Sequence, residues 1–219
     1  MIRDLNANDF LYILAAARWT IALSLIAIVS GGLLGLVVML ARLSRSRIMR
    51  NVFMAYIQFF QATPLLMQLF LVFFGGTLVG IRFDAWTAAL IAFSLHSSAF
   101  LGDIWHGCVL SVPRTQWEGA RALALPNWVT LRLVIAPQAG RLAVAPTIGF
   151  LVQLIKGTSL ASIIGFTELV RAGQFITNAT LQPLFVYGFV ACLFYMICWP
   201  LSKLSQAVEI RLSRGFQRN

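Results

Sequence analysis

Charged side chains are scarce in this chain of 219 residues. Asp, Glu, Lys and Arg make up only 11% of it, whereas 59% of the residues are hydrophobic and the mean hydropathy is +0.83. An average soluble domain carries about 25% charged residues and has no need of apolar runs long enough to cross a bilayer. The composition therefore excludes an ordinary soluble protein and predicts an all-α, multi-pass integral membrane protein.

Acidic residues are fewer still, because seven Asp and Glu stand against 17 Lys and Arg, and the formal net charge is +10. A basic balance of this size is compatible with nucleic-acid binding, but basic residues at the ends of membrane spans give the same total. The positions of the basic residues, described below, favour the second explanation. We expect these basic residues to contact the headgroups of the lipid bilayer, and we expect no nucleic-acid partner.

The sequence also lacks the motifs of common catalytic and metal sites. It contains no GxxxxGK[ST] phosphate-binding loop and no GxSxG nucleophile elbow, and Cys108, Cys192 and Cys198 have no paired metal-ligand spacing. We therefore predict no catalytic residue, no metal site and no cofactor on this chain. If the protein moves a solute uphill, the energy comes from elsewhere.

Five stretches are apolar enough to be membrane spans, since about 20 apolar residues cross the hydrocarbon. They lie at about residues 19–40, 53–74, 85–106, 142–157 and 184–203. Residues 1–18 mix charges with apolar side chains, which predicts a short helix on the membrane surface, and they lack the features of a removable signal peptide. Gly31 and Gly35 either permit close helix approach or reflect the ordinary frequency of glycine in membrane helices.

The basic residues predict the orientation of the spans. With the N-terminus outside, twelve of them are cytoplasmic: Arg42, Arg45, Arg47, Arg50, Arg114, Arg121, Arg132, Arg141, Lys203, Arg211, Arg214 and Arg218. Five are external: Arg3, Arg18, Arg82, Lys156 and Arg171. The opposite orientation would reverse this ratio and violate the positive-inside rule. We expect a cytoplasmic C-terminus and a cytoplasmic loop at residues 112–140.

Two short helices are expected within this loop. Thr115 and Glu118 have the spacing of a capping box, which predicts a helix start near Gln116. Pro126 stops this first helix, and Asn127 can cap a second one that ends before the next proline.

This loop resembles the cytoplasmic EAA loop of ABC importer permeases. The resemblance is carried by Glu118-Gly119-Ala120, Leu125 and Ile135-Ala136-Pro137. In that family the first helix inserts into a groove on the ATPase subunit, which implies the coupling residues Trp117, Glu118, Gly119, Ala120, Arg121 and Ala124. Gly119 replaces the usual first alanine, Ala124 the usual glycine and Ala136 the common leucine before proline.

The second span carries an unusual polar load. Pro64 predicts a kink, and Gln61, Thr63 and Gln68 lie around it. These side chains either line a cavity or form hydrogen bonds between helices, and the second reading is favoured. The segment FFQATPLLMQLFLVFFG resembles the FRGTPLL-type second span of polar amino acid permeases, with Gln61-Ala62 in place of Arg-Gly.

The fourth span is predicted to be short and broken by Pro146. The segment after it, KGTSLASIIGFTELVRAGQ, resembles the KDTSL region of polar amino acid permeases, with Gly157 in place of Asp. Irregular backbone at membrane depth is typical of translocation paths. Together with the second span, this makes the candidate path residues Gln61, Thr63, Gln68, Gln153, Lys156, Thr158, Ser159 and Glu168. For Lys156, simple snorkelling to the membrane surface is an equal alternative.

Two further polar residues lie in the third span. Asp103 is near its end, where a structural helix-end contact is favoured over a gating role. His96 is expected to be a hydrogen-bonded packing residue and not a proton relay, because no second ionisable group lies one turn away.

Taken together, the resemblance implies a type I ABC importer permease, a single transmembrane domain over residues 1–219 in a bacterial cytoplasmic membrane. Its partners would be two ABC ATPase subunits, a second permease subunit and an extracytoplasmic amino acid binding protein. Closure of the ATPases would rock the spans and switch the open side of a cavity for polar amino acids. The alternatives are an ion-coupled secondary transporter or channel that needs no ATPase, and a membrane scaffold without transport.

Overall fold

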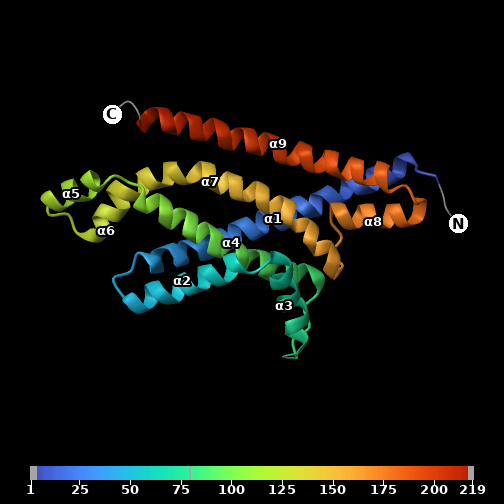
Figure 1. Ribbon diagram of the computed structural model, residues 1–219, viewed down its shortest axis with the longest axis horizontal. Coiled ribbons are helices and arrows are strands. Elements are labelled where there is room, and N and C mark those ends of the chain that lie inside the picture. Colours follow the sequence, from blue (N-terminus) through green and yellow to red (C-terminus); the bar gives the residue numbers. More distant parts are fainter. Residues whose placement is uncertain (1–3, 79, 217–219) are drawn as a thin grey trace.

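The computed structural model describes residues 4–78 and 80–216, and its regular structure there is entirely helical (Figure 1). The elements are α1 (Ala7–Arg42), α2 (Arg47–Ala62), α3 (Leu65–Leu78), α4 (Ala85–Leu110), α5 (Arg114–Ala122), α6 (Asn127–Val129), the π-helix η1 (Thr130–Ile135), α7 (Ala136–Gly157), the 3₁₀-helix η2 (Thr158–Ile164), α8 (Leu169–Thr180) and α9 (Pro183–Phe216). Arg3 and Arg218, which entered the charge count above, lie outside the described residues.

Four helices of the described chain are long and apolar enough to cross a membrane: Ala7–Arg42, Ala85–Leu110, Asn127–Ile164 and Pro183–Arg211. α2 and α3 pass the same test as a pair, bent by 103° at the break between them. The kink predicted at Pro64 is therefore confirmed as a sharp bend. If the bent pair is counted as one span, the total is five. The helices therefore permit the predicted five crossings, and that number stays a prediction.

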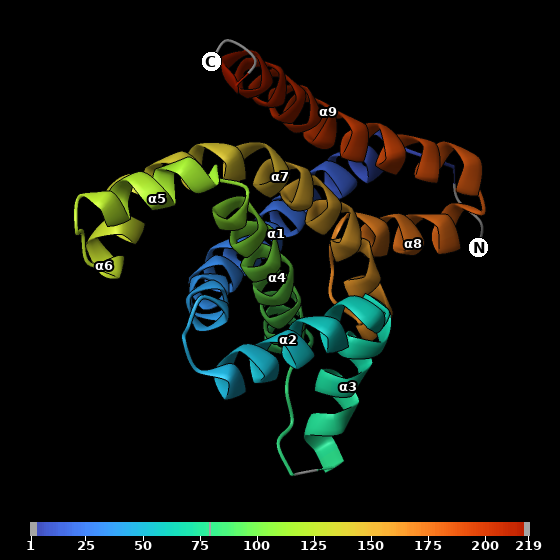
Figure 2. The same ribbon diagram turned by 60° about the vertical axis from the view of Figure 1, so that its left-hand side comes forward.

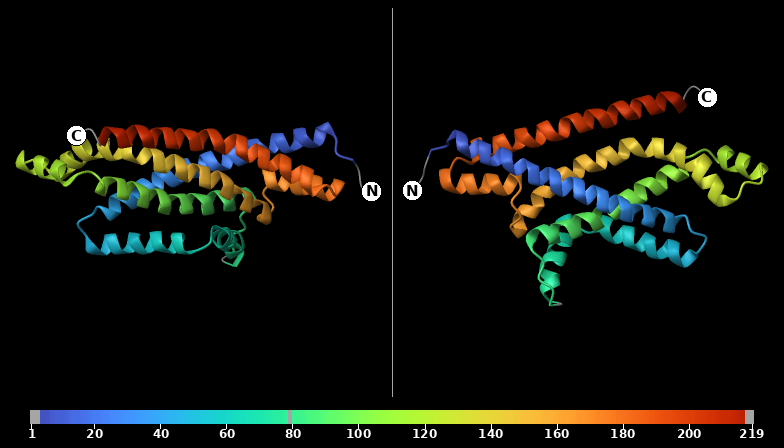
Figure 3. Two further views of the ribbon diagram at one scale, coloured as in Figure 1. Left: turned by 45° about the horizontal axis from the view of Figure 1, so that its top comes forward. Right: turned by 180° about the vertical axis from the view of Figure 1, so that it is seen from behind.

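The long helices run side by side, and the connections gather at two ends (Figures 1 and 3). At one end lie α5, α6, the α1–α2 connection and the C-terminal end of α9; the N-terminus and α8 lie at the other. The main core lies between α1, α3, α4 and α7, where Leu23, Leu69, Phe93 and Leu154 are almost fully buried. α9 packs along α7, and α3 projects from the bundle (Figure 2).

The contact between α1 and α4 depends on glycine. A Cβ atom added at Gly31 would overlap the Cβ of Ser97, and one added at Gly102 would lie 2.6 Å from Cγ1 of Val38. At Gly35 it would lie 3.2 Å from the backbone nitrogen of Gly102. Close helix approach is therefore the correct reading of the GxxxG spacing.

The predicted surface helix at residues 1–18 is wrong, because α1 continues without a break from Ala7 to Arg42. Its first turns are covered by protein: Ile13 and Ala16 are buried against Leu169 of α8 and Val186 of α9. Local composition suggested an amphipathic surface segment, but this tertiary packing extends the span helix instead.

The predicted helix end before Pro137 and the predicted break at Pro146 are also wrong, since one continuous helical segment runs from Asn127 to Ile164. Its backbone widens into π-helix ahead of Pro137, and the N–H of Ala136 donates to the carbonyl of Leu131, five residues earlier. Such local adjustments let membrane helices pass through proline.

Substitution of Gly31 by Leu should destabilise the protein by about 1–3 kcal/mol, because overpacking forces α1 away from α4. The thermal unfolding midpoint of the purified protein in detergent measures the effect. Gly107→Leu is the matched control, since a Cβ at Gly107 meets nothing within 4 Å. Equal midpoints for the two variants would contradict the close packing of α1 on α4.

Candidate functional site

The first candidate site is the α5–α6 hairpin, which extends beyond the end of the bundle (Figures 1 and 2). Trp117 and the buried Ala120 face inward, and Trp117 packs against a cluster that includes Val112, Ile135 and Ala139. Of the other predicted coupling residues, four are exposed: Glu118, Gly119, Arg121 and Ala124. The structure thus brings all six onto one short helix and its end, with an anchored side and a free side.

The predicted capping of the two short helices is wrong. α5 begins at Arg114, directly after Pro113, and no side chain caps it, so Thr115 already lies inside the helix. The second helix follows Pro126, and Asn127 is its first residue instead of its cap. Proline presets the backbone angle of a helix start, so the two prolines place the starts one or two residues away from the polar side chains.

The C-terminal end of α5 is a Schellman motif with an alanine in the left-handed position. Ala124 has φ +56°, the N–H of Leu125 donates to the carbonyl of Ala120 (3.0 Å), and the N–H of Ala124 donates to that of Arg121 (2.9 Å). Glycine is the residue that adopts this conformation without steric cost. This geometry explains why glycine is usual here in the family that the loop resembles, and Ala124 leaves a strained turn.

The second candidate site is the bend between α2 and α3. Gln68 is buried, and its Nε2 donates to the carbonyl of Phe60 (2.8 Å), whose helical partner would be the N–H that Pro64 lacks. The same Nε2 also donates to the carbonyl of Thr63 (3.0 Å) at the break between the two helices. Its Oε1 lies 3.0 Å from Nδ1 of His96. Gln68 therefore holds the bend together inside the protein. His96 is the hydrogen-bonded packing residue that was predicted, with its ring centroid 4.4 Å from that of Phe100.

Asp103 joins three helices beside this bend. Its Oδ1 lies 3.3 Å from NH1 of Arg42 on α1, and its Oδ2 accepts a hydrogen bond from Nε2 of Gln61 on α2 (3.1 Å). The predicted structural contact of Asp103 is therefore confirmed. Sequence reasoning missed Arg42 as its partner, although both residues lie near the C-terminal ends of spans that the predicted topology runs in the same direction. Gln61 remains exposed, so it can both make this bond and face the bend.

The third candidate site is the junction of α7 and η2. Lys156 and Ser159 line a cavity of about 580 Å³ together with Tyr187, Tyr195 and Ser202 of α9. Gln153 is exposed, whereas Thr158 is buried and donates to the carbonyl of Ile155 (2.7 Å). A Cβ at Gly157 would lie 3.2 Å from Cδ2 of Leu65, so this junction adjoins the bend.

Glu168 caps α8 and is fully buried. Its Oε1 accepts the N–H of Arg171 (2.9 Å), and its Oε2 has no hydrogen-bond partner among the described residues. Burial raises the pKa of this carboxyl to about 7, an effect that the N–H groups of Val170 and Arg171 only partly oppose. The structure does not bring Glu168 to the cavity that Lys156 and Ser159 line.

Residues 27–207 match the family described as "Binding-protein-dependent transport system inner membrane component". Among curated proteins, the chain is 38% identical over 213 residues to the L-cystine transport system permease protein TcyB of Bacillus subtilis, covering 96% of this chain and 91% of the relative. It is 36% identical over 194 residues to the probable amino-acid ABC transporter permease protein YckA of the same species (89% and 86%). It is 30% identical over 202 residues to the glutamine transport system permease protein GlnP of Escherichia coli (91% and 92%).

Two solved structures share the fold. The crystal structure of an amino acid ABC transporter with histidines superposes with a TM-score of 0.88 at 27% identity, over 95% of this chain and 100% of that one. An inward-facing conformation of the MetNI methionine ABC transporter superposes with a TM-score of 0.74 at 19% identity, over 93% and 99%, which shows likeness of fold alone.

Ala124→Gly should stabilise the end of α5 by about 1 kcal/mol, because it removes the steric cost of a Cβ atom in the left-handed region. The thermal unfolding midpoint should rise slightly. Ala122→Gly, two residues earlier in the helix, is the matched control and should lower the midpoint, since glycine costs about 1 kcal/mol in helical backbone. If both variants lower the midpoint, the turn at Ala124 is not strained.

Glu168→Gln should remove part of the pH dependence of stability. The folded pKa is raised above 4.5 to about 7, so the native protein binds more protons than the unfolded chain between these values and the free energy of unfolding falls as pH rises through this window. Thermal unfolding at pH 5 and pH 8 should show a smaller difference for the variant.

The control for this experiment is Asp84→Asn. Asp84 caps α4, and the hydroxyl of Thr87 lowers the pKa of its carboxyl from 3.8, so its contribution to stability is lost only in the acidic range below that value and is constant between pH 5 and pH 8. The Asp84→Asn variant should therefore keep the wild-type difference between these two pH values. A Glu168→Gln variant that keeps the full loss of stability between pH 5 and pH 8 would show that another group is responsible.

Proposed function

Because the chain belongs to the family of inner membrane components of binding-protein-dependent transport systems, we propose that it is the permease subunit of a bacterial ABC importer for polar amino acids. The three relatives above are named as permeases for amino acids, among them L-cystine and glutamine. The observation that carries the proposal is the helix α5, which is anchored on one side through Trp117 and exposed on the other at Glu118 and Arg121, as docking to a separate ATPase would require.

The arrangement of the basic segments supports a cytoplasmic position for α5. The first two basic groups lie at the α1–α2 connection and on α5 to α7, and the third begins near the C-terminal end of α9. The ribbon brings these segments to one end of the bundle (Figure 3). Since basic residues concentrate on the cytoplasmic side, this end is proposed to be cytoplasmic and the N-terminal end external.

The contacts of α5 suggest how a pull on it would reach the spans. Trp117 packs against the cluster that contains Val112, two residues after α4, and Ile135, just ahead of α7, and Ala120 on the same helix is buried. α4 is in turn tied to α1 by the glycine contact and to α1 and α2 through Asp103. A displacement of α5 would therefore move these helices together, as rigid-body alternating access requires.

The proposed substrate path uses the accessible polar residues near the bend and the α7–η2 junction. These are Gln61, Thr63, Gln153, Lys156 and Ser159, which are exposed or half-buried. Gln68, Thr158 and Glu168 are buried and bonded within the protein, so we assign them to the framework of the path. An amino acid carries a carboxylate and an ammonium group, which the cation of Lys156 and the amide and hydroxyl groups can bind as ion and hydrogen-bond partners.

The proposed complex contains two ABC ATPase subunits, a second permease subunit of the same or a sister chain, and an extracytoplasmic amino acid binding protein. ATP and Mg²⁺ bind to the ATPases. An ion-coupled secondary transporter is less well supported, because it needs an intramembrane acid free to bind an ion and Asp103 is paired with Arg42.

Glu118→Lys should uncouple transport from ATP hydrolysis. Charge reversal on the exposed side of α5 should lower uptake of a radiolabelled amino acid at least about tenfold, the effect of losing about 1.4 kcal/mol of docking free energy. ATP hydrolysis by the ATPases and the amount of permease in the membrane should change much less. Uptake by cells, ATPase activity of the purified complex and immunoblots of membranes measure the three quantities.

The control is Glu209→Lys, the same charge reversal at another exposed site on α9. It should leave uptake near the wild-type rate. Unchanged uptake in Glu118→Lys, at a normal amount of permease, would contradict the docking role of α5.

A further inference from the structure

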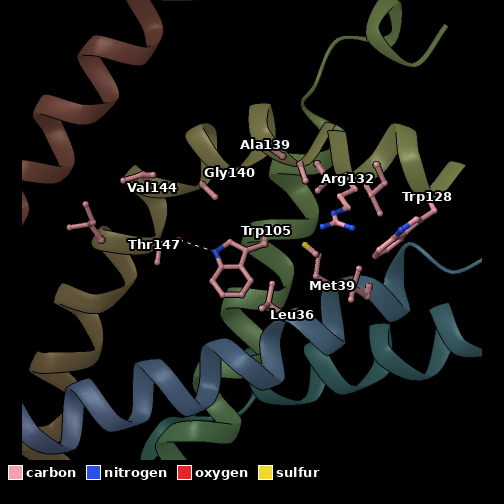
Figure 4. Close-up of a pocket in the computed structure, with 15 residues that line it drawn as sticks. Leu36, Met39, Trp105, Trp128, Arg132, Ala139, Gly140, Val144 and Thr147 are labelled. Carbon is pink, nitrogen blue, oxygen red and sulfur yellow. Dashed lines mark hydrogen bonds between the residues drawn. The ribbon is translucent and has the colours of Figure 1, made fainter. Parts of the chain in front are cut away.

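A cavity of about 560 Å³ lies between α1, α4 and the helical segment from α6 to α7, and it adjoins the α5–α6 hairpin at Trp128 (Figure 4). This volume is within the range of specific ligand pockets, about 300–1,000 Å³. Leu36 and Leu40 of α1, Trp105 of α4, Trp128 of α6, and Gly140 and Thr147 of α7 are among the residues that line it.

The walls accept an apolar ligand body. Apart from Arg132, their side chains are almost all aliphatic or aromatic. The polar atoms of Thr147 and Trp105 are bonded to each other, since Nε1 of Trp105 donates to Oγ1 of Thr147 at 2.9 Å (Figure 4). A polar solute such as a free amino acid would therefore lose hydrogen bonds to water on entry and regain few.

The cavity adjoins a lipid-facing surface of α1. Leu36 and Leu40 line it and are 44% and 46% exposed, and the neighbouring Leu33 and Val37 are 65% and 57% exposed. These residues belong to a candidate membrane span. In a bilayer such side chains contact acyl chains, so lipid is the molecule with direct access.

One cation lines the cavity. The guanidinium group of Arg132 points toward it from the π-helical turn, next to Trp128, which is 63% exposed (Figure 4). Within the described chain, Arg132 has no carboxylate in ion-pair distance and no side-chain hydrogen bond. Tryptophan and arginine together are typical of the level where acyl chains end and headgroups begin.

We infer that this cavity is a binding site for an anionic phospholipid, with an acyl chain along the apolar walls and the phosphate on Arg132. Basic pockets between membrane helices bind anionic headgroups, and arginine binds phosphate through paired N–H donors. The inference needs α1, α4 and α7 to lie in the bilayer, but it does not depend on the coupling role of α5.

The test is native mass spectrometry of the assembled transporter purified in detergent, titrated with phosphatidylglycerol or with phosphatidylcholine of the same chain length. The wild type should bind phosphatidylglycerol more tightly. Arg132→Gln should weaken phosphatidylglycerol binding at least about tenfold, as expected for loss of a charge-assisted contact, and should weaken phosphatidylcholine binding less, because the choline cation offsets the charge of its phosphate. Gly140→Leu should weaken both lipids, because a Cβ there meets nothing within 4 Å and the side chain can fill the cavity.

Two matched controls separate this site from general effects. Arg141→Gln removes a neighbouring exposed charge that does not line the cavity, and Gly107→Leu adds the same bulk at another open helical glycine. Both should bind lipid as the wild type does. Equal binding of the two lipids, or undiminished binding in Gly140→Leu, would overturn the proposal. Loss of a protein subunit from Gly140→Leu with lipid binding intact would assign the cavity to a subunit interface and would overturn it as well.

Discussion

The fold rests on the requirement that backbone polar groups at membrane depth be satisfied within the protein. The bend at Pro64 meets it with one side chain: the carboxamide of Gln68 takes up the carbonyls of Phe60 and Thr63, and His96 binds the other end of that carboxamide. The widened turn ahead of Pro137 meets it by a change of backbone hydrogen bonding. At both of these irregular segments the protein itself supplies hydrogen-bond partners for the backbone. Both segments adjoin the candidate sites.

Stiffness between these places comes from close packing. The glycines of α1 and α4 allow the two backbones to touch, and Asp103 adds a polar contact that reaches both Arg42 and Gln61. Helices joined in this way move as a unit, because a packed contact resists gradual deformation. The short helix α5, in the hairpin beyond the end of the bundle, is held through Trp117, so its position is linked to that unit.

Much of this was predictable where a local rule decides the outcome. Long apolar runs predicted the span helices, and Pro64 predicted the bend. The GxxxG spacing offered close helix approach as one of two readings, without naming α4 as the partner. Prediction failed where distant contacts decide: α1 extends to Ala7 because α8 and α9 cover its first turns. Similarly, the burial of Glu168 and the pairing of Asp103 depend on neighbours far away in sequence, and the apolar cavity beside Arg132 arises only when three segments meet.

The bend between α2 and α3 affects the stability of the chain when it has no partner. α3 leaves the bundle sideways and carries uncovered side chains such as Leu71 and Leu78, which are 64% and 90% exposed, while the polar residues of the bend lie beside it. α3 and the bend do not enclose a space by themselves. The stability of the folded chain therefore depends on the concentration of any partner that covers this surface. Such a partner would stabilise the folded chain by mass action, and the amounts of the two proteins in the membrane would then set the fraction of the chain that stays folded.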